Sequence, residues 1–303
     1  MGYFLQVVID AVSLGSLFAL VSLSIGLIFG IMRLINFAQG DFVTIGAYSL
    51  LAPAAGAAPV LFLGALPWPL MIVLVLAVVV VLALVTERVA FRPLRNAEPA
   101  TLLVSSFAVS YFLQNLVIVL YTSRPKALSL GTEISTVVDI FGLRIASIQL
   151  LTIVVTITLL VAISAFLRFT PLGLQMRASA ENFRMARLLG VRANRVIAGA
   201  FAIAGFLGGV VALLLTAQTG VIDVRAGATL AVFGFFATVI GGMGSLVGAA
   251  LGGFLVGAVS AVLQTILPAD VRPFRDAVVF AAVIVVLLVR PRGIIASKSK
   301  ERV

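Results

Sequence analysis

Polar and small residues interrupt an apolar segment near the N-terminus, in the stretch FGIMRLINFAQGD at 29–41. The side chains that break the pattern belong to Asn36, Gln39, Gly40 and Asp41. Burying such groups among apolar neighbours costs several kcal/mol unless they are paired or face water. Two interpretations are open: the residues satisfy backbone groups at a helix break where Gly40 adopts a positive φ, or they line a translocation pathway.

Asp41 is the only acidic residue in this stretch, which suggests a second hypothesis. In an ion-coupled carrier, an intramembrane carboxylate binds the coupling ion. Against this hypothesis, the only other acid within a long apolar run is Asp10, and the chain has no histidine to complete a proton relay. The ion-coupled carrier is therefore the alternative hypothesis.

A second interruption is rich in glycine, in FFATVIGGMGSLVGAALGGFLVGAVSAV at 235–262. Two sets of glycines recur at every fourth residue: Gly244, Gly248 and Gly252, and then Gly253 and Gly257. This spacing predicts helix faces that another backbone can approach closely. The start of the stretch is too dense in glycine for a helix interior, since each glycine costs about 1 kcal/mol relative to alanine. A break beside a pathway is therefore also open, at Gly241, Gly242, Gly244, Ser245 and Gly248.

A third stretch, MRASAENFRMARLLGVRANRV at 176–196, mixes arginines with apolar residues. Ser179 is predicted to cap a short helix, with Glu181 in its first turn and Gly190 at its end. Phe183, Ala186 and Leu189 would form its apolar side. The helix either binds lipid headgroups or docks on a cytosolic protein. The candidate docking residues are Arg177, Glu181, Phe183, Arg187, Leu188, Leu189 and Gly190.

Composition excludes several classes of function. Of 303 residues, 62% are hydrophobic and 11% are charged, and the mean hydropathy is +1.25, as in an integral membrane protein. Without histidine or cysteine, we expect no zinc or haem and no catalytic thiol. The three lysines do not follow a glycine-rich turn, so the chain has no P-loop of its own. We expect no enzyme activity and no cofactor.

Apolar runs predict the helices that position these stretches. Six runs suffice for a bilayer core of about 30 Å, and three are weaker. They lie at 4–31, 60–85, 102–121, 148–167, 196–215 and 246–267, and at 42–51, 230–243 and 277–289. We expect an all-α integral membrane protein: a polytopic bundle of eight to ten passages with broken helices. Residues 1–303 would form a single transmembrane domain with a cytoplasmic loop at 169–195.

Basic clusters predict the orientation, because cytoplasmic loops carry an excess of lysine and arginine. The net charge of +10 therefore indicates topology rather than nucleic-acid binding. The clusters are Arg88, Arg92 and Arg95; Arg168, Arg177, Arg184, Arg187, Arg192 and Arg195; and, in the tail, Arg290, Arg292, Lys298, Lys300 and Arg302. The C-terminus would be cytoplasmic, and 122–147, 218–228 and 268–276 would be external. These external loops are either simply solvated or a docking face for an external partner.

Four segments, in order along the chain, resemble permease subunits of branched-chain amino acid ABC importers of the LivH type. They are GLIFGIMRLINFAQGDFVTIGAY, RASAENFRMARLLGVRANRVIAGAFAIAGFLGG, VIGGMGSLVGAALGG and FRDAVVFAAVIVVLLVRPRGI. Members of this family usually carry a histidine before the glycine of the first segment and a glutamate after it. Here Gln39 and Asp41 take those places, so the polar character is retained and a protonated histidine is not available.

The resemblance implies a pathway subunit in the inner membrane of a bacterium, without an ATPase of its own. Its partners would be a homologous LivM-type permease or a second copy, two cytosolic ATP-binding subunits and an extracytoplasmic substrate-binding protein. The loop at 169–195 would then hold the coupling helix. The solute stays open among branched-chain amino acids, urea, short amides and aromatic acids, because selectivity in such importers lies largely in the binding protein.

Overall fold

The structure, a computed structural model, describes residues 2–53, 59–95, 97–128, 137–140, 143–290 and 293. Within these residues, six helices are long and apolar enough to cross a membrane. They are Phe4–Met32, Trp68–Phe91, Pro99–Tyr121, Ser147–Phe169, Ala193–Thr219 and Leu246–Ile266. The predicted all-α membrane fold is confirmed. One boundary differs clearly, because the run at 60–85 becomes helical only from Trp68, behind Pro67.

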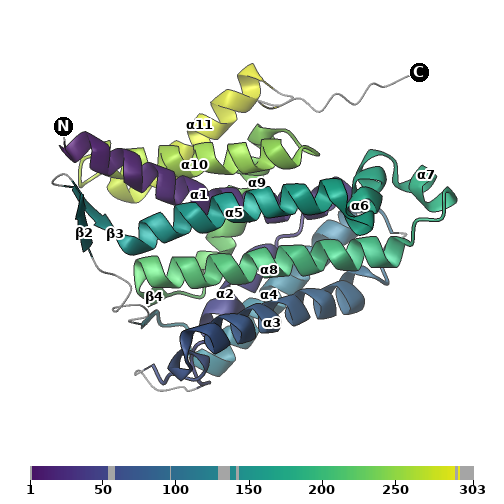
Figure 1. Cartoon of the computed structure of the whole chain (residues 1–303), viewed down its shortest axis with the longest axis horizontal. Helices are drawn as coiled ribbons and strands as arrows, with labels where there is room; N and C mark the ends of the chain where they lie inside the picture. Colours follow the sequence, from purple (N-terminus) through teal and green to yellow (C-terminus); the bar gives the residue numbers. More distant parts are fainter. Residues whose placement is uncertain are drawn as a thin grey trace. The chain divides into compact units, whose positions relative to one another are not determined.

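Eleven α-helices follow one another through the described residues (Figure 1). They are α1 (Gly2–Met32), α2 (Gln39–Tyr48), α3 (Trp68–Thr86), α4 (Pro99–Tyr121), α5 (Ser147–Phe169), α6 (Pro171–Glu181), α7 (Phe183–Leu188), α8 (Ala193–Thr219), α9 (Ala226–Gly241), α10 (Leu246–Ile266) and α11 (Arg275–Val289). The two small antiparallel sheets pair β1 (Lys126–Ala127) with β4 (Val221–Ile222), and β2 (Val137–Ile140) with β3 (Leu143–Ala146). The single turns are η1 (Leu63–Ala65), η2 (Glu87–Phe91) and η3 (Arg272–Phe274).

The three weaker apolar runs form the short helices α2, α9 and α11, of 10, 16 and 15 residues. At 1.5 Å per residue they extend about 15 to 24 Å, less than the hydrocarbon thickness of about 30 Å. Each short helix would therefore need additional chain to complete a passage. The count of eight to ten passages stays a prediction for these three segments.

The chain divides into two compact units. Unit 1 contains Met1–Gly26, Gly131–Ser164 and Phe233–Val303, and unit 2 contains Leu27–Leu130 and Ala165–Val232. Helices α1, α5 and α9 each run from one unit into the other. The single transmembrane domain stays a prediction.

Helix α2 lies at the centre of unit 2, where it packs against α3, α4 and α8 (Figure 1). Nine of its ten residues are buried, and Phe42 joins Val79 and Leu113 in an apolar cluster. A side chain at Gly46 would press on Ala212 of α8, so the glycine permits close contact. Any polar group at the start of α2 is consequently removed from solvent.

Helix α10 packs within unit 1 through glycines on two of its sides. A Cβ at Gly253 would collide with the Phe18 carbonyl oxygen of α1, and one at Gly252 with the Ala237 carbonyl oxygen of α9. The Ser22 hydroxyl lies 3.2 Å from the Thr238 hydroxyl and 2.7 Å from the Ala249 carbonyl oxygen, to which it donates. The predicted close packing of the glycine-rich segment is confirmed.

Candidate functional site

The predicted break in the first apolar segment is confirmed. Helix α1 ends at Met32 and α2 begins at Gln39. The positive φ at this break belongs to Arg33, at 55°, and Gly40 has none, so that part of the prediction is wrong. A Cβ at Gly40 would collide with the Gly227 carbonyl oxygen, and the reverse also holds. Gly40 therefore allows two backbones of unit 2 to touch.

Asn36 and Gln39 both satisfy backbone groups, as one interpretation predicts. The Asn36 Oδ1 accepts a hydrogen bond from the Ala38 amide at 3.2 Å, and the Gln39 Nε2 donates to the Ala204 carbonyl oxygen of α8 at 2.9 Å. Each side chain is 1% exposed. The Asn36 Nδ2 and the Gln39 Oε1 nevertheless have no partner among the described residues. The hydrogen bonds to the backbone thus use only one of the two polar atoms of each side-chain amide.

Asp41 lies in the first turn of α2, where the helix dipole favours a negative charge. Its side chain is 1% exposed, and neither carboxylate oxygen has a hydrogen-bond partner in the described part of the chain. Ser110 and Gln114 of α4 lie close enough to act on the carboxylate, yet make no hydrogen bond of normal geometry to it. The ion pairs of the described residues, Arg95–Glu87 and Arg275–Asp276, do not involve it.

The second break separates α9 from α10 in unit 1. Gly242 and Gly244 have φ of 107° and 94°, values that favour glycine, and the Ser245 Oγ accepts a hydrogen bond from the Gly248 amide at 3.0 Å. A Cβ at Gly241 would collide with the Gly248 carbonyl oxygen. Both predicted features, the break and the close packing, are present. Gly244 belongs to the turn, so it does not continue the helical stripe of Gly248.

The basic loop forms two helices where the sequence predicted one. Ser179 is buried inside α6 and Glu181 is the last residue of that helix, so neither starts the short helix α7. Asn182 caps α7 instead, because its Oδ1 accepts a hydrogen bond from the Met185 amide at 3.0 Å. Gly190, with φ of 89°, ends this segment as predicted. The prediction chose Ser179 as the cap, whereas the capping residue lies three positions later.

Helix α7 exposes apolar side chains beside arginines. Leu188 is 76% exposed and Leu189 is 84% exposed, whereas Ala186 is buried. Arg177, Glu181 and Arg187 are exposed and Phe183 is half-buried. An open pocket of about 450 Å³ lies beside α7, lined by Arg187, Arg192, Ala193, Asn194 and Arg195. The apolar side predicted for this helix is therefore divided, because Ala186 is buried whereas Leu188 and Leu189 face outward.

Arg95 ties the basic loop after α3 to the start of α8. Its guanidinium pairs with Glu87 and also donates a hydrogen bond to Asn194. The sequence analysis did not find this contact, or the approach of Ser110 and Gln114 to Asp41. Ser110 and Gln114 are four residues apart, so they lie on the same side of α4. This spacing was the sequence pattern that could have indicated a shared polar neighbour.

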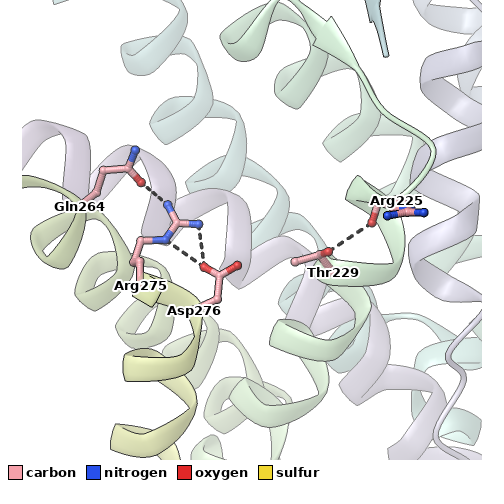
Figure 2. A network of polar contacts seen from close by, with 5 residues as sticks. All are labelled: Arg225, Thr229, Gln264, Arg275 and Asp276. Carbon is pink, nitrogen blue, oxygen red and sulfur yellow. Dashed lines mark hydrogen bonds and ion pairs between the residues drawn. The ribbon is translucent and has the colours of Figure 1, made fainter. Parts of the chain in front are cut away.

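The connections predicted to be external are described in part. Figure 2 shows Arg275 between Gln264 of α10 and Asp276, with the Arg275–Asp276 pair at 2.8 Å. In unit 2, the Thr229 hydroxyl donates to the Arg225 carbonyl oxygen at 3.2 Å (Figure 2). The predicted external acid Glu133 and the tail residues Arg292, Lys298, Lys300 and Arg302 lie outside the described residues. A docking face stays a prediction.

Residues 7–288 match the family described as "Branched-chain amino acid transport system / permease component". The chain is 35% identical to the "High-affinity branched-chain amino acid transport system permease protein LivH" of Salmonella typhimurium, over 99% of this chain and 98% of the relative. It is 34% identical to BraD of Pseudomonas aeruginosa, with the same coverage. A probable LivH of Methanocaldococcus jannaschii is 27% identical over 82% of this chain and 77% of the relative. No solved structure matches.

These relatives are transport permeases, and they do not support the alternative in which Asp41 makes the chain an ion-coupled carrier. The predicted resemblance is confirmed over almost the whole chain. The chain therefore belongs to the branched-chain amino acid transport system permease family, as a permease subunit of an ABC importer and a multi-pass protein of the bacterial inner membrane rather than an enzyme.

Proposed function

We propose that this subunit forms part of the translocation pathway of a binding-protein-dependent importer for branched-chain amino acids or a related small polar solute. The observation that carries the proposal is the 35% identity to LivH over 99% of the chain. The proposed pathway residues are Asn36, Gln39, Gly40, Asp41, Gly241, Gly242, Gly244, Ser245 and Gly248. Asn36, Gln39 and Asp41 present polar side chains, and the residues of the second break form a turn between α9 and α10 in which Gly244 is exposed and the other glycines are buried.

Physical chemistry supports a pathway role for the polar break. A membrane protein keeps buried polar groups unpaired only at a cost, and such groups within bilayer spans commonly face a substrate path. Discontinuous helices place freed backbone and short polar side chains along the path in many transporters. The unpaired atoms of Asn36, Gln39 and Asp41 fit this use.

We assign coupling to α7 and its flanks, at Arg177, Glu181, Phe183, Arg187, Leu188, Leu189 and Gly190. Two nearly fully exposed leucines beside arginines form a small apolar tip with a cationic rim. A six-residue helix offers little area to a lipid surface, whereas it fits a groove in a partner protein. An ATP-binding subunit with an apolar groove and acidic edges would complement it.

The assembly would contain a homologous LivM-type permease or a second copy of this chain, two cytosolic ATP-binding subunits and an external substrate-binding protein. The C-terminus and the basic loops would be cytoplasmic, by the excess of arginine there. Closure and reopening of the ATP-binding pair would move the spans, so that the pathway opens alternately to each side by rigid-body shifts.

Reconstitution of the complete importer in proteoliposomes tests the proposal, with ATP inside and the loaded binding protein outside. We expect uptake of L-leucine that stops when the catalytic glutamate of the ATP-binding subunits is replaced by glutamine. Uptake that persists with the inactive ATP-binding subunits would contradict the proposal.

A pair of variants at Leu189 tests the assignment of coupling to α7 and its flanks. Leu189→Asp should lower uptake at least tenfold and weaken co-purification of the ATP-binding subunits, because a charge would enter an apolar groove. Leu189→Met keeps an apolar side chain and should retain both. Equal uptake by the two variants would show that Leu189 is not part of the coupling contact. Since Leu189 is 84% exposed, neither change should alter folding.

A further inference from the structure

Helix α4 of unit 2 has two opposite faces. One face packs against α2 and contains the buried residues Leu102, Ser106, Ser110, Leu113, Val117 and Tyr121. The exposed residues on the other side recur every three or four positions, as on a single helix face. We call them the outer stripe: Val104, Ala108, Tyr111, Asn115 and Val119. Tyr111 is 72% exposed and Val119 is 79% exposed, so the described part of the chain leaves the stripe uncovered.

Two polar side chains of the outer stripe lie deep within a membrane span. Helix α4 has 23 residues and is one of the six helices that can cross a membrane. Tyr111 is its thirteenth residue and Asn115 its seventeenth. At a rise of 1.5 Å per residue, these residues lie about 2 Å and about 8 Å from the middle of the helix. A passage centred on the bilayer places both in the hydrocarbon, which extends about 15 Å on each side of its midplane.

Hydrogen bonds within the described residues do not satisfy these two side chains. The Asn115 Nδ2 donates to the Tyr111 carbonyl oxygen of the same helix at 2.7 Å. The Asn115 Oδ1 and the Tyr111 hydroxyl have no hydrogen bond in the described part of the chain. Lipid tails offer no partner either, so polar groups that face them are unfavourable. Tyrosines that face lipid are enriched at the membrane–water interface, away from this depth.

Helix α3 of the same unit shows what a lipid-facing side looks like. The same small share of α3 and of α4 is buried within the protein. The exposed residues of α3 have no hydrogen-bonding side chain: Pro69, Leu70, Ile72, Val73, Ala77, Val78, Val81 and Val85. Helix α4 has the lowest mean hydropathy of the six candidate spans. The side chains of α3 therefore suit lipid, whereas those of the outer stripe do not.

The residues around Tyr111 and Asn115 favour a protein partner over water. Phe107 and Phe112, which flank the outer stripe, are 50% and 64% exposed. A water-filled channel would leave these rings in water, whereas aromatic residues are enriched in the cores of protein interfaces. The proposed ATP-binding subunits and the binding protein lie at the two membrane surfaces. Of the proposed partners, only a second permease subunit reaches this depth.

We propose that the second permease subunit of the importer packs on the outer stripe of α4. Tyr111 and Asn115 then form hydrogen bonds with hydroxyl or amide side chains of one of its membrane-spanning helices, as polar residues do between helices in bilayers. Ala108 leaves room for that helix to approach closely. The inference rests on the proposed function, which includes a second permease but gives no surface for it.

This surface lies next to the polar break. The rings of Phe107 and Phe37 are stacked, with centroids 4.3 Å apart, and Phe37 belongs to the segment between α1 and α2. The opposite face of α4 carries Ser110, which lies close to Asp41. Helix α4 thus separates the second permease from the polar residues that we assign to the pathway. A shift of the partner against α4 would reach those residues through one helix.

Photo-cross-linking in membranes tests the surface directly. The probe p-benzoylphenylalanine takes the place of Asn115 in the complete importer, and the second permease carries an epitope tag of its own. We expect irradiation to join this chain to the second permease. Val81 of α3 is the matched control, because it is 57% exposed within a span, and the probe there should react with lipid alone. A probe at Asn115 that reacts only with lipid, or with another protein, would overturn the inference.

A pair of variants tests the hydrogen bonds. Tyr111→Phe combined with Asn115→Leu removes both polar groups, and it should lower the amount of co-purified second permease at least fivefold. Asn115→Gln keeps an amide and should retain at least half. The control Val81→Leu should leave the amount unchanged. Normal recovery of the second permease with the double variant would overturn the inference.

The folded yield of this chain separates an interface from a structural role. Tyr111 and Asn115 are exposed, so the double variant should keep its folded yield within twofold. A lower folded yield at an unchanged ratio of the two permeases would show a structural role and overturn the inference. If L-leucine uptake by the unchanged importer depends on ATP while the Asn115 probe reacts only with lipid, the inference alone fails. ATP-independent uptake would instead contradict the proposed function.

Discussion

The two breaks in the apolar pattern solve different physical problems. The polar break of unit 2 keeps side-chain atoms of Asn36, Gln39 and Asp41 unpaired and buried. In the glycine break of unit 1, by contrast, Ser245 caps α10, and Gly241 and Gly248 bring two backbones into contact. The contrast indicates that side-chain chemistry dominates at the first break and backbone geometry at the second.

Gly241→Ala should produce the largest loss of stability, because the new Cβ collides with backbone at Gly248, which cannot rotate away. We expect a loss of about 2 to 3 kcal/mol, as for other overpacked sites. Gly30→Ala is the control, since nothing lies within 4 Å of a Cβ there. The control should be neutral or more stable by up to about 1 kcal/mol, the helix-propensity difference between alanine and glycine.

Thermal unfolding in detergent, together with the folded yield from size-exclusion chromatography, measures both alanine variants. The same chemical change should thus destabilise the protein at Gly241 and not at Gly30. Similar effects at Gly241 and Gly30 would mean that close backbone contact does not govern the second break.

Ser245→Ala should have an intermediate effect. Loss of the hydrogen bond from the Gly248 amide leaves a helix N-terminus without its cap, at a cost of about 1 kcal/mol. Ser245→Asn supplies another capping oxygen and should recover most of that loss. Chemical unfolding of the three proteins in the same detergent measures the difference. No recovery with asparagine would indicate that Ser245 acts through something other than capping.

Gln39→Leu should change stability least, by less than about 0.5 kcal/mol. The variant loses the hydrogen bond to the Ala204 carbonyl oxygen but also removes the buried unpaired Oε1, and these contributions oppose each other. Uptake of L-leucine per folded importer should nevertheless fall, because a pathway group is lost. A loss of stability above 2 kcal/mol with normal uptake would place Gln39 among structural residues and weaken the comparison.

Local pattern predicted most of the helices. The break before Gln39, the end of the α7 segment at Gly190 and the close packing of Gly253 all follow from residue types and spacing. The prediction of the α7 start was wrong, since Ser179 and Asn182 both have capping side chains. Only burial of Ser179 inside α6 distinguishes them.

The sequence by itself determined that this chain is a helical membrane permease. Its apolar runs are long enough for the bilayer, its charged residues lie mostly between those runs, and the family motifs occur in order along the chain. The tertiary structure alone decided which buried polar atoms lack a hydrogen-bond partner. Gly227 decides that Gly40 serves close contact rather than a positive φ, and α4 supplies the polar side chains around Asp41; both are distant in sequence. Hydrogen bonding and electrostatics act between neighbours in space, so the surroundings of Asp41 are set by the packing of α4 against α2 and not by the adjacent residues in the sequence.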